Sequence, residues 1–465
     1  MTEKKMPNNR RHPSSFRDPS GFIFLKDGIL YRQVNNIYRE HYDALINSGL
    51  YNELTKNKLL VPHQEADSSL NSDVDAYKIL RPQKIPFISY PYEWSFSQLK
   101  QAALTTIKIQ KQALAREMTL KDCSAYNIQF YHGRPILIDT LSFEKYQAGK
   151  PWIGYRQFCQ HFLAPLALMS YLDIRLQQLL KIYIDGVPLD LASRLLPRRS
   201  YARFTLLSHI HLHAQSQKRY AGEHASETKI QGGMSKFRLS ALLDNLEAAI
   251  QSLKWREKNT EWGEYYTFTN YSADSFQQKK KIVVEFLQLV RPKSVWDLGA
   301  NTGVFSRLAS EQKIFTVAFD LDEAAVEKNV LTCLQNNEQY LFPLLLDLTN
   351  PSPSIGWAHK ERLSLEERGP ADLILALALI HHLTISNNIP FSLIADFFAK
   401  IGNHAIVEFV PRDDSQVKKL LATREDLFSF YTQEHFEESF SRYFNIKKQG
   451  LVPGTKRTIY LMKKI

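Results

Sequence analysis

Three aspartates in the second half of the chain could bind a polar ligand together. Asp297, Asp320 and Asp347 each stand at the end of an apolar, β-prone run. The runs are 295–298, 314–319 and 341–346. If the runs are successive parallel strands, the three carboxylates lie along one carboxyl edge of a sheet, where open α/β folds bind ligands. Carboxylates at such an edge can accept hydrogen bonds from hydroxyl or amino groups.

A glycine-containing turn follows the first of these runs. Gly299, Asn301 and Gly303 connect it to a helical pattern over 304–309. Glycines let the backbone come close to a ligand, and a helix N-terminus offers free N–H groups. The spacing Asp-x-Gly-x-x-x-Gly differs from the Gly-x-Gly-x-x-Gly of dinucleotide sites. The alternative interpretation is an ordinary glycine-rich turn.

Two adjacent histidines follow the next apolar run, 372–378. Histidine is suited to take a proton near neutral pH, which makes His382 and His381 the candidate catalytic bases. The alternative is that one packs in the core and the other is solvated. Further along, Glu408 lies in an apolar strand pattern, and a carboxylate buried there requires a partner.

This combination resembles class I S-adenosylmethionine (SAM)-dependent methyltransferases and predicts an α/β, Rossmann-like, seven-stranded domain. The resemblance implies SAM as cofactor, bound by Asp297, Gly299, Asn301, Gly303, Asp320, Asp347 and the upstream aromatic Tyr271. In such enzymes the glycine turn faces the methionine part, while Asp320 would meet the ribose and Asp347 the adenine amino group. Residues 350–383 also resemble bacterial methyltransferases of the nodulation-related type.

The first half carries a second constellation. Asp122, Asn127 and Asp139 occur in an order that resembles the catalytic segment of protein kinases and aminoglycoside-phosphotransferase-like kinases. The resemblance implies that Asp122 orients an acceptor hydroxyl and that Asn127 and Asp139 hold Mg²⁺ with ATP. The alternative is a helical domain in which these residues only cap turns.

Several parts of a working kinase are missing from this half. Thr-Leu follows Asp139, and a glycine-rich loop is absent from the first hairpin, which has only Gly28. Lys26 or Arg32 with Glu40 are weak candidates for the phosphate-clamping pair. The sequence therefore predicts a degenerate kinase-like α+β domain with weak or no Mg²⁺/ATP binding, no robust phosphoryl transfer, and a role in presenting substrate.

The elements that would position these residues suggest four segments. They are a flexible arm over 1–18, a kinase-like domain over 19–214, a linker and connecting helix over 215–259, and a methyltransferase domain over 260–465. In the kinase-like part, strands at 22–25 and 29–34 flank an Asp-Gly turn, and a strand at 85–93 with a proline-bearing hinge precedes a long helix over 96–118. A charged helix is expected over 360–368.

Composition limits the cellular setting and the partners. No apolar run is long enough for a membrane span, no signal peptide is evident, and three scattered cysteines suit a reducing cytoplasm. The net charge of +11 makes RNA a candidate partner, although dispersed charge favours simple solvation. A small molecule or glycan is the favoured methyl acceptor. The rivals are an RNA methyltransferase and a binding or scaffold protein with a vestigial methyltransferase. The sequence does not indicate an oligomeric state.

Overall fold

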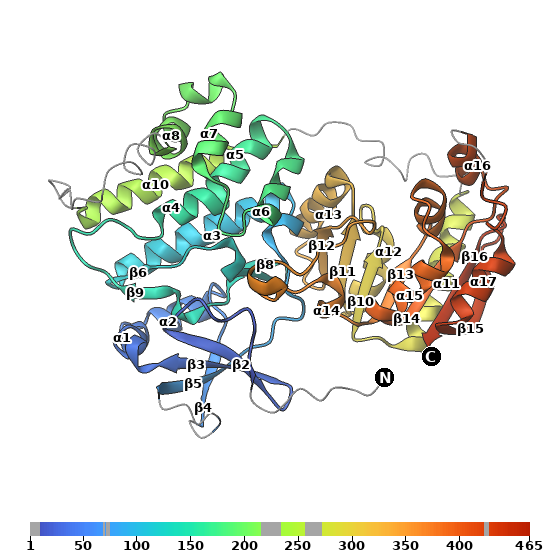
Figure 1. Ribbon diagram of the computed structural model, residues 1–465, viewed down its shortest axis with the longest axis horizontal. Helices are drawn as coiled ribbons and strands as arrows, with labels where there is room; N and C mark the ends of the chain where they lie inside the picture. Colours follow the sequence, from blue (N-terminus) through green and yellow to red (C-terminus); the bar gives the residue numbers. More distant parts are fainter. Residues whose placement is uncertain (1–9, 68–69, 71–74, 215–233, 256–271, 423–426) are drawn as a thin grey trace. The chain divides into compact units, whose positions relative to one another are not determined.

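The computed structural model describes residues 10–67, 70, 75–214, 234–255, 272–422 and 427–465. The chain forms two compact units (Figure 1). Unit 1 comprises Met1–Arg256 and Gly356–Arg362, and unit 2 comprises Glu257–Ile355 and Leu363–Ile465. Unit 1 therefore includes a short segment that the sequence places inside the methyltransferase half. No helix in the described part combines the length and apolarity needed to cross a membrane.

Unit 1 begins with an antiparallel sheet in the order β1-β2-β3-β5-β4. Its strands are β1 Arg10–Arg11, β2 Gly21–Lys26, β3 Ile29–Asn35, β4 His63–Ala66 and β5 Ala76–Pro82. The Asp-Gly hairpin was predicted correctly: Asp27 and Gly28 have φ of 51° and 75°, and a two-residue turn of this kind needs positive φ at both positions. Residues 10–18, expected in a flexible arm, instead begin with β1 paired to β2.

The rest of unit 1 is mainly helical. Its helices are α1 Arg39–Asn47, α2 Leu50–Lys56, α3 Phe96–Ala115, α4 Tyr155–Phe158, α5 Ala164–Tyr171, α6 Leu179–Ile182, α7 Leu189–Leu195, α8 Phe204–Leu206 and α10 Lys236–Ser252. Two small antiparallel sheets pair β6 Met118–Leu120 with β9 Phe143–Lys145 and, as a hairpin, β7 Ile128–Tyr131 with β8 Arg134–Leu137. The long helix α3 was predicted correctly, and Ser95 with Gln98 forms its N-terminal capping box.

One strand expected in unit 1 is absent. Residues 85–93 contain only a short 3₁₀ turn at Pro91–Glu93, and the strand before them is β5. Proline removes a backbone donor, so this stretch satisfies its polar groups through side chains instead. Gln129 accepts from the backbone N–H of Ser89 at 2.8 Å, and Glu93 accepts from that of Tyr90 at 2.8 Å.

Ion pairing fixes the segment 356–362 within unit 1. Arg17 donates two hydrogen bonds to Glu361, at 2.7 and 3.0 Å, and the Arg362 guanidinium lies 4.5 Å from the ring centroid of Tyr126. The prediction of a charged helix over 360–368 is therefore wrong for its first part. A 3₁₀ turn at Trp357–His359 precedes these contacts, and helix α14 spans only Leu365–Arg368.

Unit 2 is built on a seven-stranded sheet in the order β12-β11-β10-β13-β14-β16-β15. The strands are β10 Ser294–Leu298, β11 Phe315–Asp320, β12 Leu341–Leu345, β13 Ala371–Ala376, β14 Gly402–Phe409, β15 Phe444–Leu451 and β16 Thr458–Lys464. The first five are parallel, and β16 is antiparallel to both its neighbours. All seven strands were predicted, so the expected topology is confirmed.

Helices cover both faces of this sheet (Figure 1). They are α11 Ala273–Val290, α12 Val304–Ser310, α13 Glu323–Gln335, α15 Phe391–Ile401, α16 Ser415–Ala422 and α17 Gln433–Ser441, in addition to α14. Phe286 of α11 and Phe305 of α12 pack with Val295 on one face. Phe391 of α15 and Phe436 of α17 pack with Phe409 on the opposite face. The result is a three-layer α/β/α unit with the carboxyl ends of β10, β11 and β12 side by side.

Candidate functional site

The glycine turn after β10 has the backbone that its sequence predicts. Gly299 and Gly303 have φ of 75° and 80°, and Gly303 is the N-cap of α12. A Cβ at Gly303 would lie 2.5 Å from Nδ2 of Asn329, and one at Gly299 would lie 3.2 Å from Leu379. Both the backbone conformation and the lack of space therefore require glycine at Gly303.

Asp320, at the end of β11, is hydrogen-bonded to this turn. Its Oδ2 accepts from the backbone N–H of Asn301 at 2.6 Å, and its Oδ1 accepts from that of Asp322 at 2.9 Å. Burial raises the pKa of Asp320 to about 6, although these backbone hydrogen bonds oppose the shift. Each carboxylate oxygen retains acceptor capacity, so Asp320 can still receive hydrogen bonds from a ligand.

Asp347 lies beyond β12, next along the same edge. Its Oδ1 accepts from the backbone N–H and the hydroxyl of Thr349, at 2.8 and 2.6 Å, and the residue is half-buried. Asp322 caps α13 by accepting from the backbone N–H of Ala325. Tyr271 falls outside the described residues.

Asp297 faces inward from β10. It is 1% exposed and accepts a hydrogen bond from the Ser306 hydroxyl at 2.6 Å. Burial raises its pKa to about 7, with the Asp320 charge adding to the shift and Ser306 and Lys279 opposing it. Because its carboxylate connects β10 to α12 through Ser306, Asp297 holds the two ends of the glycine turn together from the interior of unit 2.

A buried ionic network adjoins Asp297. Lys279 of α11 pairs with Glu408 of β14 at 2.6 Å, with side-chain exposures of 3% and 0%. Arg457 lies 3.8 Å from Glu408 and pairs with Asp414 at 2.8 and 3.0 Å. Glu408 was expected to need a partner, and Lys279 is that partner. Burial lowers the pKa of Lys279 despite the attraction of Glu408.

The two histidines lie just after β13, where the chain enters a short π-helical turn at His382–Ser386. His381 is 1% exposed, and neither of its ring nitrogens has a hydrogen-bond partner in the described part of the chain. The rings of His381 and His382 are 4.1 Å apart. Burial, then the charges of His382, Arg457 and Lys279, hold the pKa of His381 well below its usual value. Burial lowers the pKa of His382 to about 4, so both rings are neutral near pH 7.

Leu379 connects the histidines to the glycine turn. Its side chain lies closest to the space that a Cβ on Gly299 would fill, and it precedes His381 by two residues. The glycine turn, the carboxylates, the ionic network and the histidines therefore form one continuous region of unit 2. Sequence reasoning missed Lys279, Ser306 and Arg457, which support this region from inside.

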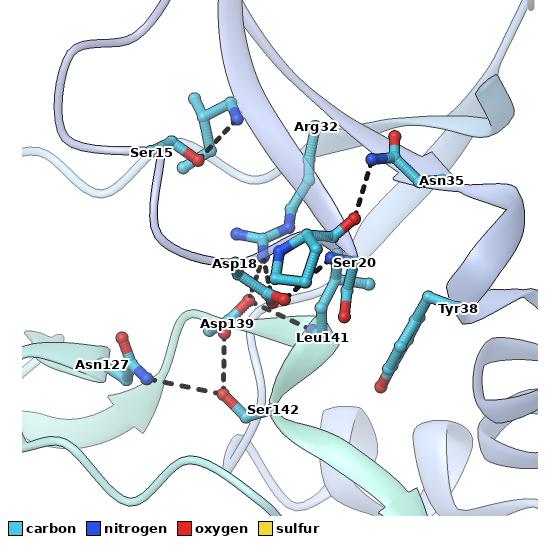
Figure 2. Close-up of polar contacts among 12 residues, drawn as sticks. Ser15, Asp18, Ser20, Arg32, Asn35, Tyr38, Asn127, Asp139, Leu141 and Ser142 are labelled. Atoms are coloured by element: carbon cyan, nitrogen blue, oxygen red, sulfur yellow. Dashed lines mark hydrogen bonds and ion pairs between the residues drawn. The ribbon is translucent and has the colours of Figure 1, made fainter. Parts of the chain in front are cut away.

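The predicted metal residues of unit 1 lie together but are engaged with one another (Figure 2). Asp139 accepts from Arg32 at 2.7 Å and from the Ser142 hydroxyl at 2.8 Å, and the Asn127 amide donates to Ser142 at 3.5 Å. Asp122 instead accepts from Gln157 at 2.8 Å. Among the described residues, no group of three or more His, Cys, Asp or Glu side chains could hold a metal ion.

The weak candidates for a phosphate-clamping pair, Lys26 or Arg32 with Glu40, have other partners. Glu40 pairs with Lys145, Lys26 donates to the carbonyl of Leu70, and Arg32 pairs with Asp139. These contacts do not fit a bound Mg²⁺–nucleotide.

Comparison with known proteins identifies the family. The chain is 35% identical over 469 aligned residues to the nodulation protein NoeA of Rhizobium meliloti (strain 1021), covering 98% of this chain and 97% of that protein. The chain belongs to the NoeA family. The predicted nodulation-related relationship is thus confirmed. No protein-family model matches this NoeA relative.

Solved structures with similar parts include methyltransferases. Magnesium protoporphyrin IX methyltransferase (ChlM) from Synechocystis PCC 6803, with bound SAH, is 15% identical and covers 44% of this NoeA relative and 93% of its own chain, with a TM-score of 0.32. The bifunctional kinase-methyltransferase WbdD is 13% identical, and the match covers 43% of this chain and 41% of the WbdD chain, with a TM-score of 0.29. The N-methyltransferase NodS from Bradyrhizobium japonicum WM9 is 9% identical, and the match covers 42% of this chain and 98% of the NodS chain, with a TM-score of 0.31.

Proposed function

We propose that this protein transfers the methyl group of SAM to a small molecule or glycan, with unit 2 as the catalytic unit. One observation carries the proposal: Asp320 at the end of β11 is hydrogen-bonded to Asn301 within the glycine turn that opens α12. This arrangement places a carboxylate beside a closely approachable backbone at the ligand-binding edge of the sheet. The seven-strand order of the class I methyltransferase fold supports the same function.

The residues at this edge fit SAM. Gly299, Asn301 and Gly303 would face its methionine part, Asp320 its ribose hydroxyls, and Asp347 its adenine amino group. When bound, SAM supplies a methyl group that is already electrophilic because it is carried by a sulfonium. The protein then needs to orient the acceptor and, for a hydroxyl or amine, to remove a proton.

The two histidines would share that second task. His382 is partly exposed and neutral near pH 7, so its ring can reach an acceptor and take a proton. His381 lies behind it, in ring contact, and is held among buried charges. We assign proton removal to His382, or to His381 if the acceptor reaches that deeper ring.

The pairing of basic residues favours a small acceptor over RNA. Many surface cations in the described ranges are neutralised by acidic neighbours, including Lys111, Arg116, Lys145, Lys236 and Lys448. Binding to a nucleic-acid backbone needs cations that are available to phosphates. The net charge of +11 therefore gives limited support to RNA as the methyl acceptor.

The role that we assign to unit 1 is to present the acceptor to unit 2.

The acceptor can be found by incubating the full-length protein with methyl-labelled SAM and fractionated cell extract. We expect label in the small-molecule or glycan fraction, and much less label at subsaturating SAM when the Asp320→Ala variant replaces the wild type. Label in RNA that nuclease removes would establish the RNA alternative. Absence of label in every fraction, with SAM bound, would favour a vestigial methyltransferase.

Asp320→Ala should weaken SAM binding while leaving the fold intact. Loss of a charged hydrogen-bond acceptor costs about 1.5–3 kcal/mol, which corresponds to roughly a 10- to 150-fold loss of affinity. Calorimetric titration measures the change, and Asp396→Ala, in helix α15 and outside the proposed SAM contacts, is the matched control. Unchanged affinity in a folded Asp320→Ala protein would remove this carboxylate from the site.

SAM affinity should also fall as the solution is acidified. The pKa of Asp320 is raised to about 6, so the carboxyl is ionised above that pH and gains a proton below it. Protonation turns one carboxyl oxygen into a donor and removes the negative charge, so the protonated form is the weaker acceptor for two ligand hydroxyls. Titrations from about pH 8 to about pH 5 should show the loss near pH 6, with a weaker pH response in Asp320→Asn. Affinity that rises on acidification would contradict this role.

A further inference from the structure

A compact charge cluster occupies the place in unit 1 where the sequence predicts a metal and nucleotide, and Figure 2 shows three of its members, Arg32, Asp18 and Asp139. Its cations are Arg32 of β3 and Lys121, and its carboxylates are Asp18 and Asp139. Arg32 lies 2.7 Å from Asp139 and 4.0 Å from Asp18, and Lys121 lies 3.5 Å from Asp18. Two positive and two negative groups therefore neutralise one another.

Asp18 comes from the loop between β1 and β2. Its Oδ1 also accepts from the backbone N–H of Ser20 at 2.8 Å, which fixes the carboxylate against the loop. The Ser20 hydroxyl in turn accepts from Lys121 at 2.7 Å. The loop thus directs a carboxylate and a hydroxyl to the two cations, without the glycines that would let a phosphate group approach the backbone.

The cations have capacity for another anion. The Arg32 side chain is 12% exposed, and its Nε is buried without a hydrogen-bond partner in the described part of the chain. Lys121 is 24% exposed and has three donors on its ammonium group. A planar guanidinium beside an ammonium is a combination that suits phosphate oxygens.

We propose that Arg32, Lys121 and Ser20 form an anion site for a phosphate or pyrophosphate group, and that Asp18 occupies it as an internal anion. A phosphate that binds the two cations would lie beside the Asp18 carboxylate. The two negative charges would repel each other more strongly there than in bulk water, because the protein surroundings screen charges less. The Arg32 cation at 2.7 Å already neutralises Asp139 and competes with a metal ion for that carboxylate. The kinase-like unit is therefore closed to Mg²⁺–nucleotide by its own side chains.

The test compares wild type with Asp18→Asn, in which the side-chain oxygen still accepts from Ser20 while the charge is lost. Inorganic pyrophosphate without metal is titrated calorimetrically into each full-length protein. We expect Asp18→Asn to bind at least about tenfold more tightly than wild type, because the cluster then carries net positive charge. Asp27→Asn removes an exposed charge from the neighbouring hairpin and should behave as wild type. Adding Arg32→Gln to Asp18→Asn should abolish the gain.

Circular dichroism and thermal melting establish whether each variant is folded. If Asp18→Asn does not fold, Asp18→Ser serves as a second variant that removes the charge. Wild-type protein that binds pyrophosphate as tightly as Asp18→Asn would overturn the proposal. Saturable binding of ATP with Mg²⁺ by the wild type would also overturn it. A folded Asp18→Asn protein without any gain would show that Arg32 and Lys121 are not an anion site.

Discussion

His382→Ala should lower the rate of methyl transfer by about 10²–10⁴-fold, the range lost when a general base is removed. SAM affinity should change little, because the ring is assigned to the acceptor side. The pattern expected is a fall in kcat without a matching change in SAM binding. Transfer of label from SAM to the acceptor fraction measures the rate, and calorimetry measures the affinity.

His381→Ala separates the two histidines. If His381 only positions His382, its replacement should cause a smaller loss, and His381→Gln should restore part of the rate by filling the same space. If His381 itself takes the proton, neither replacement retains activity and His382→Ala has the smaller effect. Full activity in both single alanine variants would leave the pair as packing residues.

Lys279→Met should destabilise unit 2 by about 3–5 kcal/mol, the cost of breaking a buried ion pair by removing one partner. Glu408 would then lose Lys279 while Arg457 stays at 3.8 Å, and Asp297 would lose a nearby positive charge. Urea unfolding measures the free energy. Lys281→Met is the matched control: its side chain is exposed on the same helix, so its effect should stay within about 0.5 kcal/mol.

A double variant tests whether the pair itself is responsible. Lys279→Met with Glu408→Leu replaces both charges by apolar groups and should recover much of the loss, since no charge is buried without its partner. A double variant less stable than Lys279→Met would show that Glu408 has other essential contacts. Equal stability of Lys279→Met and Lys281→Met would contradict the account of the network.

The strand order and the edge carboxylates could be predicted because local patterns carry them. Each β-run that ends on an aspartate became a strand with that residue at its carboxyl end or just beyond it. The burial of Lys279 could also have been predicted from the sequence. Lys279 precedes the buried Val283 by one helical turn and the buried Phe286 by two turns, which places it on the buried face of the helix.

Other contacts depend on tertiary structure that local patterns do not encode. The Arg17–Glu361 pair joins residues 344 positions apart, and the segment that holds Glu361 resembles part of a surface helix by composition alone. The loop that carries Asp18 is polar and rich in serine and proline, which favoured a flexible arm. Its pairing through β1 and its ion pairs order it instead.

Titration of the full-length protein with SAM in a calorimeter tests the central claim most directly. We expect saturable binding with one SAM per chain, weakened roughly 10- to 150-fold in Asp320→Ala and unchanged in Asp396→Ala. No binding to folded wild-type protein, or equal binding to wild type and Asp320→Ala, would contradict the assignment of this sheet edge as a SAM site.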